Sequence, residues 1–339
     1  MADCEIFEAG DFTLQSGVVL PSTRVAYRTH GQLNAARDNV IVYPTHYLGT
    51  HDSNAWAIAP GMALDPEKYF IIVPNMLGNG LSSSPSNTPA PFDGPRFPLV
   101  TVRDNIMLQH RLVTEVFGIA SLVLVTGPSM GALQSFQWGA LFPDMVQRIA
   151  PFCGAARVSR HNWLFLEGAK SALLADAAFA GGDYATPPVT GIRAFARVSA
   201  GWAWSQTFYR QQLDRERLGM PSMETFLALW WEPNFQACDA NNLLAMLATW
   251  QAADISADPR FDGNLEMALA AITAKAIVMP CRTDLYFPPE DSEIEVAHMP
   301  HAELRVIPSV WGHMAGGGVN PEDAMFINAA LTELLAVRN

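Results

Sequence analysis

Apolar and polar residues repeat with two different periods along the chain, and each period predicts a different kind of element. Residues 5–30 alternate in steps of two and carry many β-branched side chains, which predicts an antiparallel hairpin that turns near Pro21. Short apolar runs bounded by proline or polar residues are typical of buried strands. These runs span residues 39–43, 69–74, 123–126, 146–153, 276–280 and 302–308.

In the segments between these runs, apolar residues repeat with the longer period of a helix. The apolar side chains of Val102, Ile106 and Val113 fall on one face of a helix, and residues 132–140 predict a second helix that ends near Pro143. Strands that alternate with helices along a chain indicate a mostly parallel sheet with helices on both faces. The sequence therefore predicts an α/β fold.

Residues 155–270 interrupt this alternation. The segment holds six of the nine tryptophans and is predicted to be mostly helical, with a break at 181–188 where two glycines and two prolines occur. The strand pattern resumes after the segment. We therefore predict an α/β core of residues 1–154 and 271–339, with residues 155–270 inserted as a helical lid.

Composition narrows the class of protein. Of the 339 residues, 50% are hydrophobic, which is ample for a large buried core, and the net charge is −12. Only three lysines and no basic run are present, which argues against nucleic acid as a partner. No apolar stretch reaches membrane-spanning length, no secretory signal is visible, and the four cysteines have no paired spacing. These features predict a cytoplasmic protein with reduced thiols.

Candidate chemistry begins where the strand at 123–126 meets the helix that follows it. The junction reads Gly127-Pro-Ser129-Met-Gly131. A serine between two glycines on a sharp strand-to-helix turn has the arrangement of a nucleophile elbow, and the glycines leave room for a strained backbone at the serine. Ser129 is therefore the candidate nucleophile.

A nucleophilic serine needs a histidine that takes its proton and an acid that orients the histidine. In folds with this elbow, the acid and then the histidine follow the serine on loops after late strands. Asp284 follows the strand at 276–280, and His313 follows the strand at 302–308. The carboxyl ends of parallel strands meet at one edge of a sheet, which predicts a Ser129–Asp284–His313 triad.

Other acids and histidines fit these roles less well. Glu290 and Asp291 lie farther from the strand end and resemble the start of the next helix. His298 and His301 precede the last predicted strand, and His110 lies on an amphipathic helix, so these three are predicted to be structural or surface residues.

Acyl transfer also needs backbone amides that hold the oxyanion of the tetrahedral intermediate. One would be the amide of Met130, directly after the nucleophile, and the other would come from the loop after the strand at 39–43. Tyr47 is our choice for the second donor, and Leu48 is equally placed by spacing.

Two clusters of residues resemble cofactor sites but do not fit that role. His46, His51 and Asp52 follow an early strand, but their spacing matches no zinc signature. Gly78 and Gly80 begin like a dinucleotide fingerprint, yet the third glycine is missing and the prolines that follow forbid the helix that would bind pyrophosphate. The sequence thus predicts neither a metal nor an organic cofactor.

Motifs beyond the elbow extend over most of the chain, from about residue 10 to 335. They are Gln134 and Trp138, Asp65-Pro-Glu-Lys-Tyr-Phe70, Asn75-Met-Leu-Gly78, Phe97-Pro-Leu-Val-Thr-Val-Arg-Asp104, Gly182-Asp-Tyr184, Ala196-Arg197 and Gly312-His313. As a set, these motifs resemble the homoserine O-acetyltransferase family of α/β-hydrolases. The resemblance implies the α/β-hydrolase fold, a ping-pong reaction through an acetylated Ser129, and a homodimer built on the lid helices.

At several positions the chain differs from the transferases of that family. The transferases place an aspartate directly after the catalytic histidine, where this chain has Met314, and a tyrosine seven residues after the lid arginine, where it has Trp204. The lid arginine itself is present as Arg197, with either a substrate contact or a structural salt bridge as its role. Residues 79–87 also replace the usual loop of the transferases, and this stretch is similar to the branch of the family that works as esterases and cleaves short alkyl acetates. We predict that Arg197, Trp204 and Met314 contact the substrate.

The sequence as a whole predicts a serine carboxylesterase that cleaves short-chain, chiefly acetyl, esters through an acyl-serine intermediate. The alternatives are a homoserine O-acetyltransferase that uses acetyl-CoA and a non-catalytic binding protein of the same fold. The expected partners are a small ester and a second copy of the chain.

Overall fold

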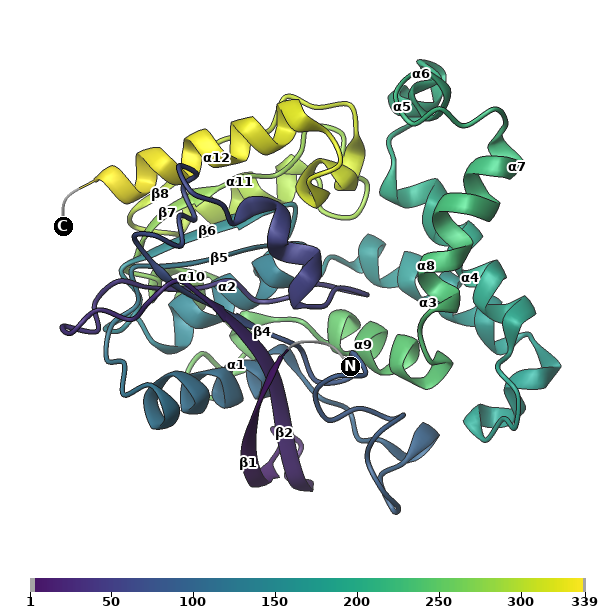
Figure 1. The fold of residues 1–339 in the computed structure, drawn as a ribbon, viewed down its shortest axis with the longest axis horizontal. Coiled ribbons are helices and arrows are strands. Elements are labelled where there is room, and N and C mark those ends of the chain that lie inside the picture. Colours follow the sequence, from purple (N-terminus) through teal and green to yellow (C-terminus); the bar gives the residue numbers. More distant parts are fainter. Residues whose placement is uncertain (1–3, 338–339) are drawn as a thin grey trace.

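The computed structural model describes residues 4–337, and its centre is a sheet of eight strands in the order β1-β2-β4-β3-β5-β6-β7-β8 (Figure 1). Strand β2 is antiparallel to both of its neighbours, and the remaining pairs, from β4 to β8, are parallel. The strands are β1 (Glu5–Thr13), β2 (Val19–His30), β3 (Val40–Val42), β4 (Phe70–Pro74), β5 (Leu124–Pro128), β6 (Arg148–Phe152), β7 (Lys275–Val278) and β8 (Ala302–Leu304). The prediction of a mostly parallel sheet is confirmed.

The hairpin of β1 and β2 turns at residues 14–18, so the predicted turn near Pro21 is wrong. The amide of Leu14 donates to the carbonyl of Val18 at 2.9 Å and closes the turn. Pro21 lies inside β2, beside Ser22, whose φ of 47° marks an irregularity in the pairing with β1. Proline lacks an amide hydrogen, and a bulge is one of the places where a strand tolerates it.

Helices cover both faces of the sheet, as the alternation of strands and helices predicts. In Figure 1, α12 lies over one face, and α1, α2 and α10 lie under the other. All residues of α2 are buried, because this helix runs directly beneath the central strands. The helices of the core are α1 (Val102–Arg111), α2 (Met130–Leu141), α10 (Leu265–Ala270), α11 (Pro289–Ala297) and α12 (Pro321–Ala336).

Short helical turns occupy several of the connections between these elements. They are η1 (His51–Ala57), η2 (Gly94–Arg96), η3 (Leu112–Val116), η6 (Ile255–Ala257) and η7 (Gly312–Gly317). Within residues 4–337, no helix is both long enough and apolar enough to cross a membrane.

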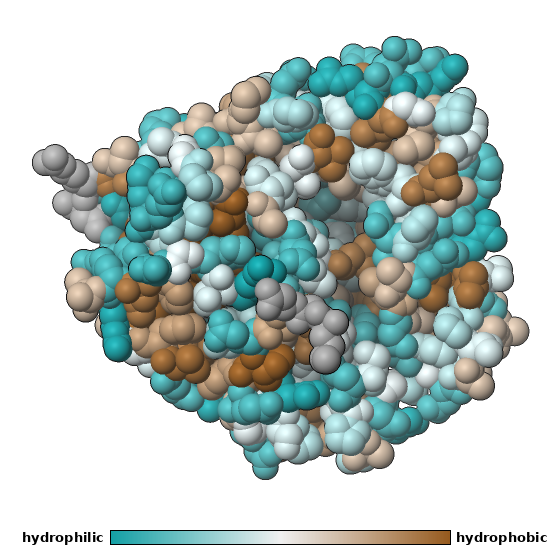
Figure 2. Space-filling view, in the orientation of Figure 1, coloured by the Kyte–Doolittle hydropathy of each residue, from teal (hydrophilic) through white to brown (hydrophobic). Residues whose placement is uncertain are grey.

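Between β6 and β7 the chain forms a run of helices, residues 160–251, which we call the helical segment. In Figure 1 it stands beside the sheet and leaves a hollow in the surface where the two parts meet (Figure 2). Helix α10 falls inside the predicted insertion but packs against α11 of the core. The helical segment contains α3 (Arg160–Leu174), η4 (Ala177–Gly182), α4 (Val189–Ala203), α5 (Gln206–Arg210), α6 (Leu213–Glu216), α7 (Met223–Phe226), η5 (Leu227–Trp231), α8 (Glu232–Gln236) and α9 (Ala240–Gln251).

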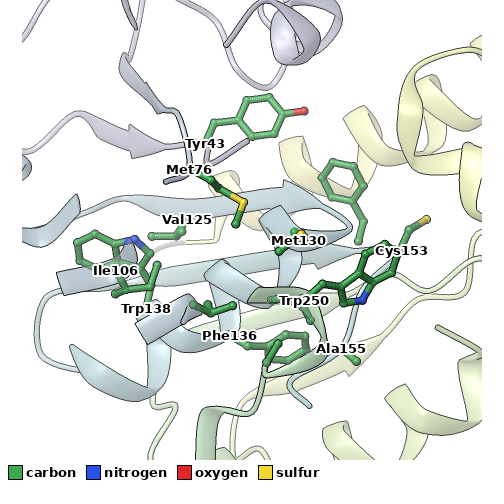
Figure 3. Close-up of a cluster of buried hydrophobic side chains, with 14 of the residues drawn as sticks. Tyr43, Met76, Ile106, Val125, Met130, Phe136, Trp138, Cys153, Ala155 and Trp250 are labelled. Carbon is green, nitrogen blue, oxygen red and sulfur yellow. The ribbon is translucent and has the colours of Figure 1, made fainter. Parts of the chain in front are cut away.

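The helical segment and the sheet share one hydrophobic core. Met130, Phe136 and Trp138 of α2 pack beneath the central strands, and Trp250 of α9 belongs to the same cluster (Figure 3). Large apolar side chains dominate the energy of such a cluster, at about 25 cal/mol for each Å² removed from water. The helical segment is thus fixed to the core by packing as well as by chain connections.

The last strand is shorter than the run of apolar residues predicts. Strand β8 ends at Leu304, and beyond it backbone hydrogen bonds and a bridge between Ile307 and Cys281 continue the pairing as far as Ile307. His313 then follows in the short helical turn η7.

Candidate active site

The elbow at Ser129 has the strained backbone that its sequence predicts. Ser129 lies between β5 and α2 with φ of 53° and ψ of −121°, a conformation that costs a residue other than glycine about 1–3 kcal/mol. A Cβ atom on Gly127 would lie 3.0 Å from the backbone of Gly131, and one on Gly131 would lie 2.8 Å from the carbonyl oxygen of Pro44. The need for glycine on both sides of the serine is therefore confirmed.

A third glycine, which the motif did not reveal, completes this close packing. A Cβ atom on Gly154 would lie 2.7 Å from the carbonyl oxygen of Ser129 and 2.4 Å from the Cβ of Ala132. Gly154 follows β6, the neighbour of β5 in the sheet. The contact joins residues 25 positions apart, and only the order of the strands could have revealed it.

The structure brings together the three residues of the predicted triad. The Ser129 hydroxyl donates to Nε2 of His313 at 2.9 Å, and Nδ1 of His313 donates to Oδ2 of Asp284 at 2.8 Å. The other carboxylate oxygen of Asp284 accepts from the amides of Tyr286 and Phe287, at 2.8 and 3.2 Å. A carboxylate held by three donors is a fixed acceptor that can orient the imidazole.

Aromatic rings enclose the imidazole of His313. The ring of Tyr286 meets it edge to face at 4.7 Å between centroids, and the ring of Phe287 lies at 5.6 Å. Burial, reinforced by the charge of Asp284, raises the pKa of Tyr286 well above its usual value, so the phenol stays neutral. His313 thus has an apolar collar that limits access of water to its hydrogen bond with the acid.

The competing acids and histidines lie where the sequence predicts. Glu290 and Asp291 occupy the first turn of α11. His110 stacks on Phe142 at 4.1 Å between ring centroids, and His301 is exposed. None of these residues contributes to the hydrogen bonds that join the three triad side chains within the described chain.

A cavity of about 290 Å³ opens next to Ser129 and His313. One wall comes from core loops, and the other comes from α3, α4, η5, α8 and α9 of the helical segment. Half of the six tryptophans of the segment, Trp230, Trp231 and Trp250, line it. Apart from two histidines, His46 and His313, the lining has no ionisable side chain other than tyrosine among residues 4–337. The cavity is therefore apolar with a few neutral polar groups, as is usual for small-molecule sites.

Candidates for the oxyanion hole lie at this cavity. Met130 is the first residue of α2, so its amide has no acceptor within the helix, and the helix dipole favours negative charge there. Tyr47 and Leu48 both line the cavity on the turn after β3. The assignment of Met130, and of Tyr47 over Leu48, stays a prediction.

Of the three predicted substrate contacts, only Met314 lines the cavity among the described residues. Trp204 has no exposed surface and packs against Phe208 and Trp311, with ring centroids 4.2 and 5.6 Å away. It directly follows α4, with an extended backbone, and its indole belongs to this aromatic cluster. The structure therefore does not bring Trp204 to the cavity.

Arg197 also lies away from the cavity. Its guanidinium pairs with Glu232 at 2.7 Å and with Glu224 of α7, both within the helical segment. The hydrogen bond to Glu224, followed by that to Glu232, raises the pKa of Arg197. A guanidinium held by two carboxylates has little capacity left for a substrate, so the salt-bridge alternative describes Arg197 in this structure.

The early histidines have local partners. Nδ1 of His46 donates to the carbonyl of Tyr47 at 2.9 Å, and burial lowers the pKa of His46, which favours its neutral form. The side-chain amide of Asn75 donates to Nδ1 of His51 at 3.1 Å. Within residues 4–337, no three histidine, cysteine, aspartate or glutamate side chains are grouped so that they could hold a metal ion.

Comparison with known proteins agrees with this geometry. Residues 40–316 match the family described as alpha/beta hydrolase fold. The chain is 39% identical to an ethyl acetate hydrolase of Pseudomonas veronii over 98% of this chain and 95% of that protein. It is 31% identical to a homoserine O-acetyltransferase of Chlorobium chlorochromatii over 90% and 88% of the two chains. The solved structure of the acetyl esterase MekB superposes with a TM-score of 0.96 at 39% identity, covering 99% of this chain and 97% of that one.

Proposed function

The chain belongs to the α/β-hydrolase fold family, and within that family we propose that it is a serine esterase that cleaves short-chain acetyl esters. The observation that carries the proposal is the position of His313, hydrogen-bonded both to Ser129 and to Asp284 at the wall of an uncharged cavity. The names of the similar proteins, an ethyl acetate hydrolase and an acetyl esterase, support the same substrate class.

The first half of the reaction forms the acyl-enzyme. His313 takes the proton of the Ser129 hydroxyl, and the serine oxygen attacks the carbonyl carbon of the ester. The amides of Met130 and Tyr47 hold the oxyanion, a contribution worth about 10²–10³ in rate for each donor. His313 then protonates the leaving alcohol, and Ser129 remains acetylated.

The second half returns the free enzyme. Water enters the place of the alcohol, gives a proton to Nε2 of His313 and attacks the acetyl carbonyl. The bond between the carbonyl carbon and the serine oxygen then breaks, and His313 returns the proton to Ser129. Asp284 stays ionised throughout and stabilises the imidazolium that forms in each half. The products are acetate and an alcohol, and no cofactor takes part.

The lining of the cavity supports water as the acyl acceptor. Homoserine would bring an ammonium and a carboxylate into the site, and a buried charge without a partner costs several kcal/mol. The residue after the catalytic histidine is Met314, whose thioether cannot neutralise an ammonium, and Arg197 is already held by Glu224 and Glu232. Water and small uncharged alcohols need no such partner.

The size of the cavity supports small esters. Its volume of about 290 Å³ lies at the lower end of the range that is usual for small-molecule sites. Three of the residues that line it, Leu166, Phe195 and Phe235, are nearly fully buried and packed among other side chains. A short ester fits this space, whereas a long acyl chain would have to displace packed side chains.

The proposal is tested by turnover of p-nitrophenyl esters of acetate, butanoate and octanoate, beside acetyl-CoA with homoserine. We expect the highest kcat/KM on acetate, a steep fall toward octanoate, and no O-acetylhomoserine above the uncatalysed level. Faster turnover of octanoate would contradict the small-ester assignment, and efficient acetyl transfer to homoserine would replace the esterase with the transferase alternative. Absence of any ester turnover would favour the non-catalytic binding protein.

We also propose a homodimer in which the helical segment contributes the interface. Large apolar side chains are exposed on this segment at Trp163, Leu164, Val189 and Leu229, and association through the segment would remove them from water. Light scattering coupled to gel filtration is expected to give twice the mass of 37.0 kDa, and a mass of one chain would contradict the dimer.

A further inference from the structure

His313 lies nine residues beyond the end of β8, the strand that precedes it. Strand β8 ends at Leu304, and the last bridge to the segment that follows the neighbouring strand β7 is at Ile307. Residues 308–312 therefore approach the histidine without strand pairing. Because catalysis requires His313 to stay within hydrogen-bond distance of two other side chains, these residues need another anchor.

One hydroxyl contacts both ends of this stretch. Oγ1 of Thr283 donates to the carbonyl of Ser309 at 3.1 Å and accepts from the amide of Gly312 at 3.2 Å. Thr283 directly precedes Asp284, and Gly312 directly precedes His313. We propose that Thr283 is a positioning residue, whose hydroxyl fixes the histidine loop to the acid loop and so sets the distance between Asp284 and His313.

The far side of the loop is anchored as well. The Ser309 hydroxyl donates to the carboxylate of Asp323 at 2.8 Å and accepts from the amide of Trp311 at 3.1 Å. Asp323 is buried in the first turn of α12, the helix that lies across the sheet. The Thr283 hydroxyl thus links Gly312 to Ser309, and Ser309 is hydrogen-bonded to Asp323 of the core.

The backbone of Gly312 also packs closely against the helical segment. Its φ is 63°, and a Cβ atom there would lie 2.7 Å from the amide nitrogen of Ser205 and 2.8 Å from the carbonyl oxygen of Ala203. Gly312 is therefore pressed against the end of α4 on one side and held by the Thr283 hydroxyl on the other. A shift of Gly312 would be passed directly to His313.

This inference rests on the proposed function, because it assigns Thr283 a role in the same triad. Thr283 does not line the cavity within the described chain, so it acts through Asp284 and His313 and not on the substrate. Its removal should lower kcat and leave KM nearly unchanged. A small misplacement of a catalytic group can cost about 100-fold in rate, which sets the scale of the expected loss.

The test compares Thr283→Val, which keeps the shape and removes the hydroxyl, with Thr283→Ser, which keeps the hydroxyl. Thr114→Val is the matched control, because Thr114 is also half-buried and its hydroxyl donates to a backbone carbonyl, at 2.8 Å, outside the triad loops. Each variant is assayed for kcat and KM on p-nitrophenyl acetate, with active sites counted by organophosphate titration. The low-field proton resonance of the His313–Asp284 hydrogen bond is recorded by NMR, and the thermal midpoint is measured.

We expect kcat per titrated site to fall about 10- to 100-fold in Thr283→Val, with a shifted or broadened low-field resonance, and to stay within about threefold in Thr283→Ser and Thr114→Val. Thr283→Ala provides a second variant without the hydroxyl if the valine does not fold. Wild-type kcat and an unchanged resonance in either hydroxyl-free variant would overturn the proposal. If Ser129→Ala also retained full ester turnover, the failure would lie with the proposed function instead.

Discussion

The two walls of the cavity are built in different ways. The core wall consists of loops after β3, β5, β7 and β8, and its functional groups are held by hydrogen bonds and by glycines that permit close backbone contacts. The wall from the helical segment consists of aromatic and aliphatic side chains from α3, α4, η5, α8 and α9, held by packing. The core wall carries the reactive atoms, and the helical wall determines what can approach them.

The two walls are nevertheless joined at the triad. The side-chain amide of Asn162 in α3 donates to the carbonyl of Tyr286 at 2.7 Å, and the Tyr286 hydroxyl donates to the carbonyl of Ser199 in α4 at 3.1 Å. The Ser205 hydroxyl, just beyond α4, donates to the carbonyl of Val310 in the histidine loop. The helical segment therefore supports the loops of Asp284 and His313, and we expect it to act as a fixed part of the site and not as an opening lid.

Substitution of the triad residues in the core wall should have the largest effect on activity. We expect Ser129→Ala, His313→Ala and Asp284→Asn each to lower kcat for p-nitrophenyl acetate by about 10³-fold or more, because the three side chains act as one unit. Steady-state kinetics on enzyme of verified fold measures this loss.

A wild-type kcat in Asp284→Asn would show that another carboxylate orients His313. Asp291→Asn is the control, because Asp291 lies in the first turn of α11 and makes no hydrogen bond to His313 within the described chain. Its activity should equal that of the wild type.

These reactive residues could be predicted from the sequence because each is fixed by local pattern and strand order. The elbow motif identifies Ser129, and parallel strands bring the residues after β7 and β8 to the same edge of the sheet. Contacts such as those of Gly154 and Thr283 could not be predicted, because they join segments whose spacing in the sequence carries no signal.

The helical wall was harder to predict for the same reason. A cluster of tryptophans indicates an apolar surface, but only packing between distant helices decides which indoles face the cavity. Trp231 lines it, whereas Trp204 is buried against Phe208 and Trp311. Likewise, the partners of Arg197 lie 27 and 35 residues away, on α7 and α8.

The junction between the two parts should make stability depend on pH. Glu295 of α11 is buried, and its Oε1 accepts from the amide of Ala156, where the chain leaves the core. Burial, the main cause, raises the pKa of Glu295 from 4.5 to about 8. Between these values the folded state holds a proton that the unfolded state has lost, so the free energy of unfolding should fall as pH rises from about 5 to 8.

Glu295→Gln tests this linkage, because glutamine keeps the acceptor for Ala156 and cannot ionise. Urea denaturation at a series of pH values should show a fall in wild-type stability, of the order of a few kcal/mol, that is missing from the variant. Parallel curves for the two proteins between pH 5 and 8 would contradict a protonated Glu295 in the folded state.

Cutting the link between the walls should have a smaller effect on activity than breaking the triad. Asn162→Ala leaves the carbonyl of Tyr286 without its donor, which should cost about 1–3 kcal/mol of stability and lower kcat about 10-fold. Asn241→Ala is the matched control, since Asn241 is also buried in the helical segment and donates to a backbone carbonyl, that of Gly182, at 2.9 Å. It should lose stability but keep its kcat. Equal values of kcat in the two variants would show that the helical segment does not support the triad.

The smallest effect is expected for Arg197→Gln. The ion pair with Glu224 is largely exposed, and Glu232 keeps Arg193 as a partner. Exposed ion pairs contribute little, so the thermal midpoint should move by less than about 3 °C, and kcat/KM on acetate esters should stay unchanged. A tenfold loss of kcat/KM would restore Arg197 as a residue that contacts the substrate.

The most direct test of the account is the fate of the acetyl group on Ser129. Acetyl-enzyme is formed from p-nitrophenyl acetate, saturating homoserine is added, and both acetyl-Ser129 and O-acetylhomoserine are followed by mass spectrometry. Because the lining of the cavity, among residues 4–337, has no carboxylate for the ammonium and no lysine or arginine for the carboxylate, we predict that acetate is released to water at the same rate with and without homoserine. O-acetylhomoserine formed at a rate comparable to acetate release would contradict the esterase assignment.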